Sequence, residues 1–238
     1  MIEEYSWKNT PTDKTRIKVR LSNICNLKCR ICGPEYSNRF LGYREMLRDY
    51  DIDFSELVYL ELSGGDPFQD KRTEEFLSKV RPYTKVLIHT NGCKYPDYLS
   101  PHWNFSVTCN GVKDVAEFVA WSGFDWDTYS ENMGKWKTHK TSWRTNISVL
   151  NVLDFDNIRN LNLEPHEIEY QQGFLDIATL HPNVKKLIKG FDEYKNSKEW
   201  NPEHTKELIQ NINNIEGAKI PDSTNAIFKE IKKWKMSI

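Results

Sequence analysis

The stretch Cys25-Asn26-Leu27-Lys28-Cys29-Arg30-Ile31-Cys32-Gly33 brings three cysteines together directly after the largely apolar run 17–21. Thiolates crowded into one short loop usually share a metal. An iron–sulfur cluster is one such group, and a zinc ion with a distant fourth ligand is another. Three unrelated core thiols are the remaining interpretation. Motifs elsewhere in the chain are needed to distinguish these three interpretations.

The composition of the 238 residues fits one large α/β domain, or a domain with a small appendage. Lys+Arg and Asp+Glu nearly cancel, at 33 and 34, so neither nucleic acid nor a membrane surface is an expected partner. No apolar run approaches the roughly 20 residues that span a bilayer, and the first residues carry no secretory pattern. Five cysteines, three of them clustered, argue against a secreted disulfide framework, so a cytoplasmic protein is expected.

Short apolar runs alternate with amphipathic stretches through residue 172, which predicts a parallel sheet with right-handed crossovers. A closed eight-unit barrel takes about 250 residues, so the expected fold is α/β, an open partial β/α barrel of about six units. The chemistry of such barrels lies at the C-terminal ends of the strands, where the unusual motifs of this chain fall. The expected strands are 16–22, 57–62, 86–89, 105–108, 146–150 and 167–170, and a helix is expected over 37–50.

From residue 173 the pattern changes to amphipathic helices. The expected domains are therefore a barrel over 1–172 and a helical extension packed on it over 173–238. Asn201-Pro202 predicts the start of one helix, and Gly217 its end. Apolar residues at helical spacing predict one helix through Val184, Leu187, Ile188, Phe191 and Tyr194, and another through Ile227, Ile231 and Trp234.

The CxxxCxxC spacing followed by Gly33 resembles the radical SAM superfamily, in particular the barrel part of its SPASM and twitch-type members. The resemblance implies that Cys25, Cys29 and Cys32 bind a [4Fe–4S] cluster whose fourth iron is capped by S-adenosylmethionine (SAM). It also implies an enzyme that cleaves SAM reductively and abstracts hydrogen from a substrate through a 5′-deoxyadenosyl radical. No cysteine follows Cys109, so a single cluster is expected, without the auxiliary clusters of those relatives.

The resemblance also assigns SAM contacts. The segment 63–67, Ser-Gly-Gly-Asp-Pro, resembles a Gly-Gly-Glu-Pro motif near the SAM amino group, and paired glycines let a backbone approach a ligand closely. Thr108 and Asn110 resemble positions near the ribose or carboxylate. Ile31 replaces an aromatic residue over adenine, and Asn151 is a candidate adenine contact. The expected SAM-binding residues are Ile31, Ser63, Gly64, Gly65, Asp66, Thr108, Asn110 and Asn151; no catalytic residue is identified.

Three features depart from the family pattern. Asp66 replaces a glutamate, Ile31 replaces an aromatic residue, and no arginine lies four to five residues before Asp125-Trp126, where the chain reads Ala120-Trp121-Ser122-Gly123. Arg144 or Lys113 could substitute for that arginine. These departures keep open the alternative of a degenerate barrel that binds SAM or a partner without catalysis.

A zinc-binding interaction module is the other alternative, with His89 or His102 as its fourth ligand. His89 precedes Thr90-Asn91-Gly92, which resembles the Thr-Asn-Gly that closes the third strand in the family, and a structural role for this histidine is expected. For the enzyme, the expected partners are a small-molecule or peptide substrate and an electron donor such as flavodoxin or ferredoxin.

Overall fold

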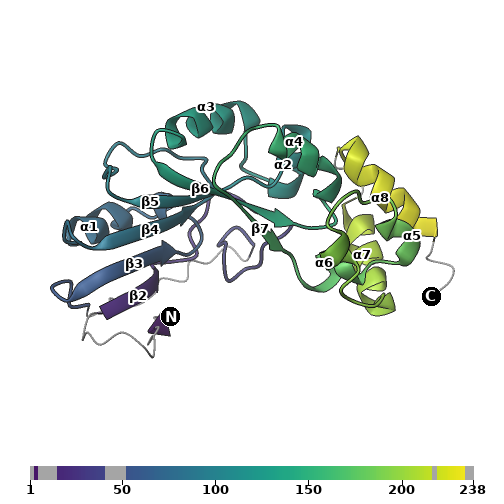
Figure 1. Cartoon of the computed structure of the whole chain (residues 1–238), viewed down its shortest axis with the longest axis horizontal. Helices are drawn as coiled ribbons and strands as arrows, with labels where there is room; N and C mark the ends of the chain where they lie inside the picture. The colour runs from purple at the N-terminus through teal and green to yellow at the C-terminus, as the bar shows by residue number, and fades with distance from the viewer. Residues whose placement is uncertain (1–2, 5–14, 41–51, 216–218, 234–238) are drawn as a thin grey trace. The chain divides into compact units, whose positions relative to one another are not determined.

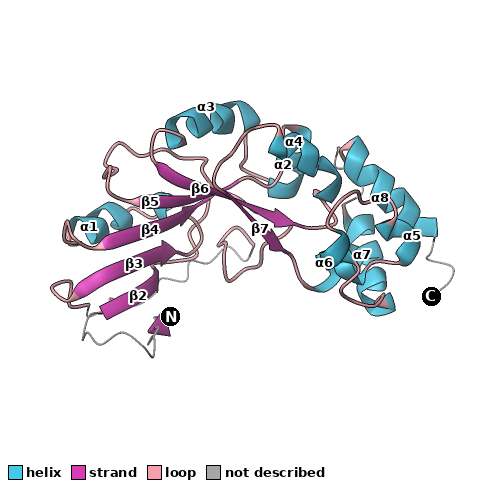
Figure 2. Ribbon diagram, in the orientation of Figure 1, coloured by secondary structure: helices cyan, strands magenta, loops and turns pink. Residues whose placement is uncertain are grey.

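The computed structural model of the chain describes residues 3–4, 15–40, 52–215 and 219–233. Its strands form one sheet in the order β1-β2-β3-β4-β5-β6-β7 (Figures 1 and 2). β2 to β7 are the six parallel strands of an open sheet, and β1 pairs antiparallel with β2. This arrangement confirms the expected α/β class and open β/α sheet.

The elements described have the following bounds. The strands are β1 Glu3–Glu4, β2 Thr15–Arg20, β3 Leu57–Ser63, β4 Lys85–Thr90, β5 Asn104–Thr108, β6 Lys140–Ile147 and β7 His166–Tyr170. The α-helices are α1 Arg72–Ser78, α2 Asp114–Ala120, α3 Trp126–Trp136, α4 Phe155–Arg159, α5 Pro182–Lys185, α6 Asp192–Lys195, α7 Pro202–Asn214 and α8 Asp222–Lys233. None of the helices in these ranges combines the length and apolar character that a membrane crossing needs.

Alternating burial explains why the first strands were predictable. Leu60 and Leu62 of β3 are fully buried, as are Val86 and Ile88 of β4, while the residues between them are partly exposed. Leu62 lies opposite Ile88 in the parallel register, so the apolar side chains of neighbouring strands share one face. Because the strands run parallel, the segments that follow β2, β3, β4 and β5 emerge at the same edge of the sheet.

The strand expected over 146–150 is wrong in its bounds. β6 runs over Lys140–Ile147 and alternates strictly between buried and partly exposed positions. After it, Asn151 Oδ1 accepts a 2.8 Å hydrogen bond from Ser148 N–H, which turns the chain. The apolar residues of that segment are therefore buried in a turn, and the strand itself consists largely of polar residues.

The single helix expected through Val184 and Tyr194 is also wrong. The chain forms two short helices, α5 and α6, with Gly190 and Phe191 between them at φ values of 75° and 55°. Left-handed backbone cannot continue an α-helix. α7 and α8 are confirmed, whereas Gly217, Trp234 and most of the helix expected over 37–50 lie outside the described residues.

The chain divides into two compact units. Unit 1 comprises residues 1–108 and 121–143, and unit 2 comprises residues 109–120 and 144–238. The boundary expected at residues 172 and 173 stays a prediction.

Candidate functional site

The cysteine loop, residues 22–33, follows β2 in unit 1 and is held by hydrogen bonds that its backbone N–H groups donate. Cys25 N–H donates to Asn38 Oδ1 at 3.1 Å, Leu27 N–H donates to Cys25 Sγ at 3.4 Å, and Cys32 N–H donates to the Cys29 carbonyl at 3.0 Å. These bonds turn the loop back on itself, so that its thiols are fixed by local structure. Cys25 and Cys29 are half-buried and Cys32 is exposed.

The Gly64-Gly65 turn after β3 packs directly on the cysteine loop. Gly65 N–H donates to the Ser22 carbonyl at 3.0 Å, and Asp66 N–H donates to the Ile24 carbonyl at 2.8 Å. A Cβ at Gly64, which has φ +136°, would lie 2.5 Å from the Ser22 carbonyl oxygen, and a Cβ at Gly65 would overlap the Ile24 carbonyl oxygen. The two glycines are therefore needed for the approach of this turn to the cysteine loop.

The Asp66 carboxylate is buried inside the protein and joins two strand ends. It accepts hydrogen bonds from Phe68 N–H at 3.0 Å, from the Thr90 hydroxyl at 2.8 Å and from Asn91 N–H at 2.7 Å. Burial raises the pKa of Asp66, and these hydrogen bonds oppose that shift. The carboxylate thus positions the turns after β3 and β4, which sequence reasoning did not foresee.

Asn91 connects the turn after β4 to the cysteine loop. Its amide Nδ2 donates to Asn26 Oδ1 at 2.7 Å and lies 3.7 Å from Cys25 Sγ, while its Oδ1 accepts Cys93 N–H at 3.0 Å. The Thr-Asn-Gly resemblance was the signal for this residue. The structure gives it a contact with a predicted cluster ligand.

The turn before α3 closes another side of the cysteine loop. Lys28 N–H donates to the Ser122 carbonyl at 3.2 Å, and a Cβ at Gly123 would overlap the Asn26 carbonyl oxygen. Lys28 Nζ and Arg30 Cζ lie 4.5 and 4.6 Å from the centroid of the Trp121 ring. These cation–π contacts fasten the middle of the loop to residues about 90 positions away in sequence.

The thiols of the loop are a donor set that suits a cation. Burial raises the pKa of Cys25 to about 12, with the Asp66 charge as the next cause. Burial also raises the pKa of Cys29, and the neighbouring Cys32 and Cys25 add to the shift. Cys32 keeps a solvent-exposed surface, although enough protein surrounds its sulfur for burial to raise its pKa too. Mutually repelling thiolates become favourable when a cation binds them, so the three residues fit an iron–sulfur cluster.

No three His, Cys, Asp or Glu side chains within the described ranges are arranged to hold a single metal ion. His89 Nε2 lies 3.0 Å from Glu61 Oε1, and Glu61 also pairs with Lys18 at 2.8 Å. His102 is exposed in the turn before β5. The zinc alternative with either histidine as fourth ligand stays untested.

Ser63 and Thr108, two of the predicted SAM-binding residues, are the last residues of β3 and β5. Ser63 Oγ is shielded from solvent, and within the described part of the chain it has no hydrogen-bond partner. Thr108 is half-buried, and its carbonyl accepts the Tyr129 hydroxyl at 2.9 Å. Ile31 is half-buried within the cysteine loop. A buried hydroxyl without a partner fits a site that a polar ligand completes.

Comparison with known proteins gives distant relatives. No family model matches the chain. The GTP 3′,8-cyclase of Helicobacter pylori strain 26695 is 28% identical over 86 residues, covering 32% of this chain and 27% of the relative. The GTP 3′,8-cyclase of Thermodesulfovibrio yellowstonii is 22% identical over 203 residues, covering 75% of this chain and 62% of the relative. These matches agree with the cysteine motif and with the parallel sheet. The chain is a distant homologue of radical SAM proteins.

Two solved structures are similar to this chain. They are hexahistidine-tagged anSMEcpe with bound AdoMet, with a TM-score of 0.46 and 14% identity, and Streptococcus suis SuiB bound to S-adenosylmethionine, with a TM-score of 0.48 and 11% identity. Each covers 82% of this chain, and the match covers 57% and 44% of the other chain respectively. The chain thus spans only part of the length of the curated relatives and of these structures.

Two further predicted SAM contacts, Asn110 and Asn151, belong to unit 2. Asn110 Oδ1 accepts Asn146 N–H at 2.9 Å. Asn151 is 1% exposed; its Oδ1 accepts both the N–H and the hydroxyl of Ser148, and its Nδ2 donates to the carbonyls of Asn110 and Asn146. Asn151 could contact adenine only by giving up one of these four hydrogen bonds. Both assignments stay predictions.

Arg144, considered as a substitute for the missing arginine, makes its own ion pairs in unit 2. Its guanidinium lies 3.5 Å from the Glu167 carboxylate and 3.4 Å from the Glu169 carboxylate. Its Nε is buried without a partner among the described residues.

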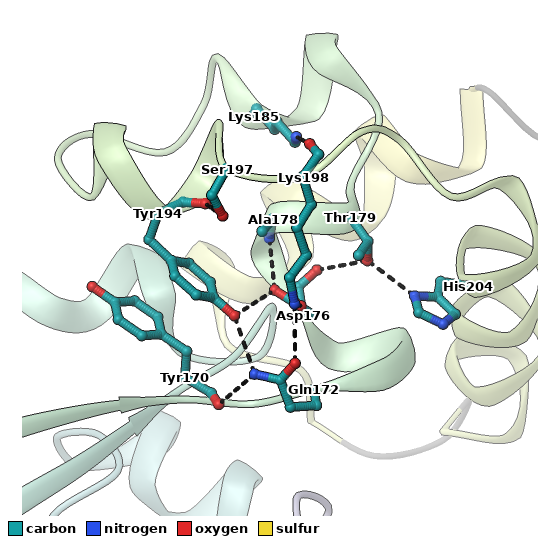
Figure 3. A network of polar contacts seen from close by, with 10 residues as sticks. All are labelled: Tyr170, Gln172, Asp176, Ala178, Thr179, Lys185, Tyr194, Ser197, Lys198 and His204. Atoms are coloured by element: carbon teal, nitrogen blue, oxygen red, sulfur yellow. Dashed lines mark hydrogen bonds and ion pairs between the residues drawn. The ribbon is translucent and has the colours of Figure 1, made fainter.

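A polar network in unit 2 surrounds Asp176, just after β7 (Figure 3). Asp176, 1% exposed, accepts hydrogen bonds from Tyr194 hydroxyl at 3.0 Å, Lys198 Nζ at 2.7 Å and Ala178 N–H at 2.8 Å. Lys198 also donates to Gln172 Oε1 at 3.0 Å. In Figure 3 these side chains converge on the carboxylate, so this network fastens α6 and the segment after it to the segment after β7.

Proposed function

We propose that this radical SAM homologue is an enzyme that uses one [4Fe–4S] cluster to cleave SAM and abstract hydrogen from a substrate. The observation that carries the proposal is the packing of the three-cysteine loop on the Gly64-Gly65 turn and the Asn91 turn, all at one edge of the sheet. When bound, such a cluster supplies one electron, and SAM cleavage then supplies the 5′-deoxyadenosyl radical.

The residues of unit 1 have distinct proposed tasks. Cys25, Cys29 and Cys32 hold the cluster. The carbonyls of the 63–66 turn accept the SAM amino group, because the N–H groups of Gly65 and Asp66 are directed to the cysteine loop. The Ser63 hydroxyl, which is shielded from solvent, forms a hydrogen bond with a polar group of SAM.

Further proposed contacts rest on the family resemblance. Thr108 and Asn110 lie near the ribose or carboxylate, and Ile31 and Asn151 lie near adenine. The substrate is a small molecule or a peptide, and the electron donor is of the flavodoxin or ferredoxin class. A cytoplasmic location agrees with the need of the thiols for a reducing compartment.

The test is an anaerobic reconstitution with iron and sulfide. We expect about four irons and four sulfides per chain, a reduced EPR signal that changes when SAM is added, and 5′-deoxyadenosine after reduction. Alanine variants of Cys25, Cys29 and Cys32 should each lose the cluster absorbance. The matched control is Cys109→Ala, because Cys109 is buried in unit 2 and donates to the Gly111 carbonyl. Full clusters in all three variants would refute the ligand assignment.

A second candidate is a structural zinc site. It is the alternative that the cysteine loop leaves open, because three clustered thiols also suit a zinc ion with a distant fourth ligand. Purification with one zinc per chain and no sulfide would support this candidate. A cluster that binds SAM but never yields 5′-deoxyadenosine would instead support a non-catalytic barrel.

A further inference from the structure

Three basic side chains surround the exposed Trp121 in unit 1. Trp121 is 49% exposed, and Lys28 Nζ and Arg30 Cζ lie 4.5 and 4.6 Å from the centroid of its ring. Arg39 Nη2 donates to the hydroxyl of the next residue, Ser122, at 3.4 Å. Trp121 with these three cations forms a surface that we call the Trp121 patch.

The backbone at Trp121 is held in a conformation that bulky residues rarely adopt. Its φ is 56°, in the left-handed region, where a side chain crowds against its own backbone. Lys28 N–H donates to the Ser122 carbonyl at 3.2 Å and Gly123 packs against the Asn26 carbonyl, so contacts with the cysteine loop fix this turn. The fold thus keeps a large aromatic ring half open to solvent at a cost in conformational energy. Such a residue indicates a functional surface.

The Trp121 patch is positive although the whole chain is nearly neutral. The formal net charge of the chain is −1, whereas residues 22–40 contain the three cations of the patch and a single acid, Glu35. The next acid after Trp121 in sequence is Asp125, which caps α3 through Thr128 N–H. Two of the cations lie against the same indole ring, so their charges repel each other. An acidic partner would relieve this repulsion.

The patch lies on the loop that is proposed to hold the cluster. Lys28 and Arg30 are the residues on either side of Cys29, and the nearby Cys32 is exposed. A protein docked on the patch would therefore lie beside two of the proposed cluster ligands. Tryptophan and arginine are enriched among the residues that dominate protein interfaces, and opposite charge steers a partner to such a surface.

We propose that the Trp121 patch is the docking surface for an acidic protein that delivers one electron to the cluster. This inference rests on the proposed function, which requires such a reductant. The reduced carrier loses one electron and the cluster gains it, and no covalent bond forms or breaks. Electron-transfer complexes bury small surfaces, usually below about 1,200 Å², so a patch of this size suffices as the centre of the interface.

The test uses reduced flavodoxin, an acidic one-electron carrier, which is mixed anaerobically with the reconstituted full-length protein. Stopped-flow absorbance follows reduction of the cluster. The variants are Arg39→Gln and Arg39→Glu, because Arg39 is exposed and lies outside the cysteine motif. Lys85→Glu is the matched control, since Lys85 is exposed at the start of β4, whereas the Asn91 turn that contacts the cysteine loop follows the end of that strand.

At low salt, the rate constant for reduction by flavodoxin should fall in the order wild type, Arg39→Gln, Arg39→Glu. A total loss of about tenfold is expected, because electrostatic steering raises association rates by roughly 10- to 1,000-fold. The differences should vanish at about 1 M salt, where the screening length is about 3 Å. Lys85→Glu should match wild type. Photoreduction by deazaflavin, a small molecule that needs no docking surface, should be equally fast in all these proteins and shows that their clusters are intact.

Binding of oxidised flavodoxin gives a readout that needs no turnover. Its affinity for the oxidised, cluster-loaded chain, measured from the spectra of ¹⁵N-labelled flavodoxin, should weaken in the same order. The proposal is overturned if Arg39→Glu equals wild type in both rate and affinity, or if flavodoxin neither binds nor reduces the wild type. It is also overturned if Arg39→Glu weakens binding of a single-stranded oligonucleotide and leaves flavodoxin binding unchanged. A chain that takes up only zinc overturns the proposed function as well, and iron and sulfide analysis tells this outcome from the others.

Discussion

The Asp66 carboxylate accepts a 2.7 Å hydrogen bond from Asn91 N–H, and this bond joins the turn after β3 to the turn after β4. Each of the two turns also bonds to the cysteine loop, through Asp66 N–H to the Ile24 carbonyl and through Asn91 Nδ2 to Asn26 Oδ1. The three segments at this edge of the sheet therefore support one another. A change in one is expected to disturb the other two.

The first prediction concerns Asp66→Ala. The change leaves the N–H groups of Phe68 and Asn91 and the Thr90 hydroxyl without their acceptor in a buried site. We expect the free energy of unfolding to fall by on the order of 3 kcal/mol, measured by urea denaturation, and cluster uptake to fall with it. Asp125→Ala is the matched control, because that exposed carboxylate caps α3 through Thr128 N–H, whereas Asp66 bonds to the turns after β3 and β4. An equal loss in both variants would contradict the role of Asp66.

The second prediction compares two glycines. A Cβ at Gly65 would overlap the Ile24 carbonyl oxygen, which is backbone and cannot easily move, whereas a Cβ at Gly134 in α3 would meet nothing within 4 Å. Gly65→Ala should lose about 2 kcal/mol of stability and much of its cluster. Gly134→Ala should gain about 0.5–1 kcal/mol, because alanine is the better helix former. Thermal denaturation and iron analysis of both variants check this pair, and a stable, cluster-loaded Gly65→Ala protein would argue against it.

Much of the fold could be predicted because burial alternates along the early strands. Leu60 and Leu62, or Val86 and Ile88, show the period of two that indicates a half-buried strand. The sequence of β6 does not show this alternation of apolar and polar residues, although its burial alternates. Its buried positions include Thr141 and Thr145, whose hydroxyls bond to main-chain carbonyls, so a buried position was occupied by a polar residue.

The candidate site was predictable in its location and less so in the roles of its residues. The motifs at the strand ends indicated which turns meet, because parallel strands end at one edge. They could not show that the turn of Gly64 and Gly65 approaches the backbone of the cysteine loop. Nor could they show that the Asp66 carboxylate accepts hydrogen bonds from Thr90 and Asn91. Such contacts depend on which loops touch in three dimensions, and sequence spacing does not contain that information.

The third prediction is a pH dependence that arises from Glu61. The hydrogen bond from His89, and after it the one from Lys18, lowers the pKa of Glu61 from 4.5 to about 2, against the opposing effect of burial. A folded pKa below the unfolded one means that the ionised form stabilises the protein above pH 4.5. This contribution is lost as the pH falls from 4.5 towards 2.

Thermal denaturation of the apoprotein between pH 6 and pH 3 measures this effect. Wild type should be more stable than Glu61→Gln at pH 6, and the difference should shrink towards pH 3. The control is Glu75→Gln, which removes an exposed carboxylate of α1 that pairs with Lys79 at the end of the helix. The expectation fails if the gap between wild type and Glu61→Gln stays constant over this range.

The fourth prediction concerns Asn151, whose amide makes four hydrogen bonds inside unit 2. Asn151→Ala should lose about 3 kcal/mol of stability, because the Ser148 donors and the Asn110 carbonyl lose their partner in the interior. Asn160→Ala removes the same side chain from an exposed position and should lose much less. The urea concentrations at the midpoint of unfolding, measured for both variants, show whether the two losses of stability differ. A nearly neutral Asn151→Ala with weakened SAM binding would favour an adenine contact over this structural role.

The fifth prediction concerns the amide of Asn91, which reaches the sulfur of a proposed cluster ligand. Its Nδ2 lies 3.7 Å from Cys25 Sγ and also donates to Asn26 Oδ1. Hydrogen bonds to the ligand sulfurs help set the reduction potential of a cluster, because they stabilise the added negative charge. Asn91→Asp removes these donors and keeps an acceptor for Cys93 N–H, so the potential should become more negative.

Stability should fall only modestly in this variant, by about 1–2 kcal/mol, because the backbone bond to Asp66 remains. Potentials measured by EPR-monitored titration provide the readout. Asn132→Ala is the control, since its amide holds the Cys93 carbonyl in the same turn without touching a sulfur. If both variants shifted the potential equally, the effect would arise from loosening of the turn. A shift confined to Asn91→Asp would assign it to the position beside Cys25, where the variant loses the amide donor and gains a negative charge.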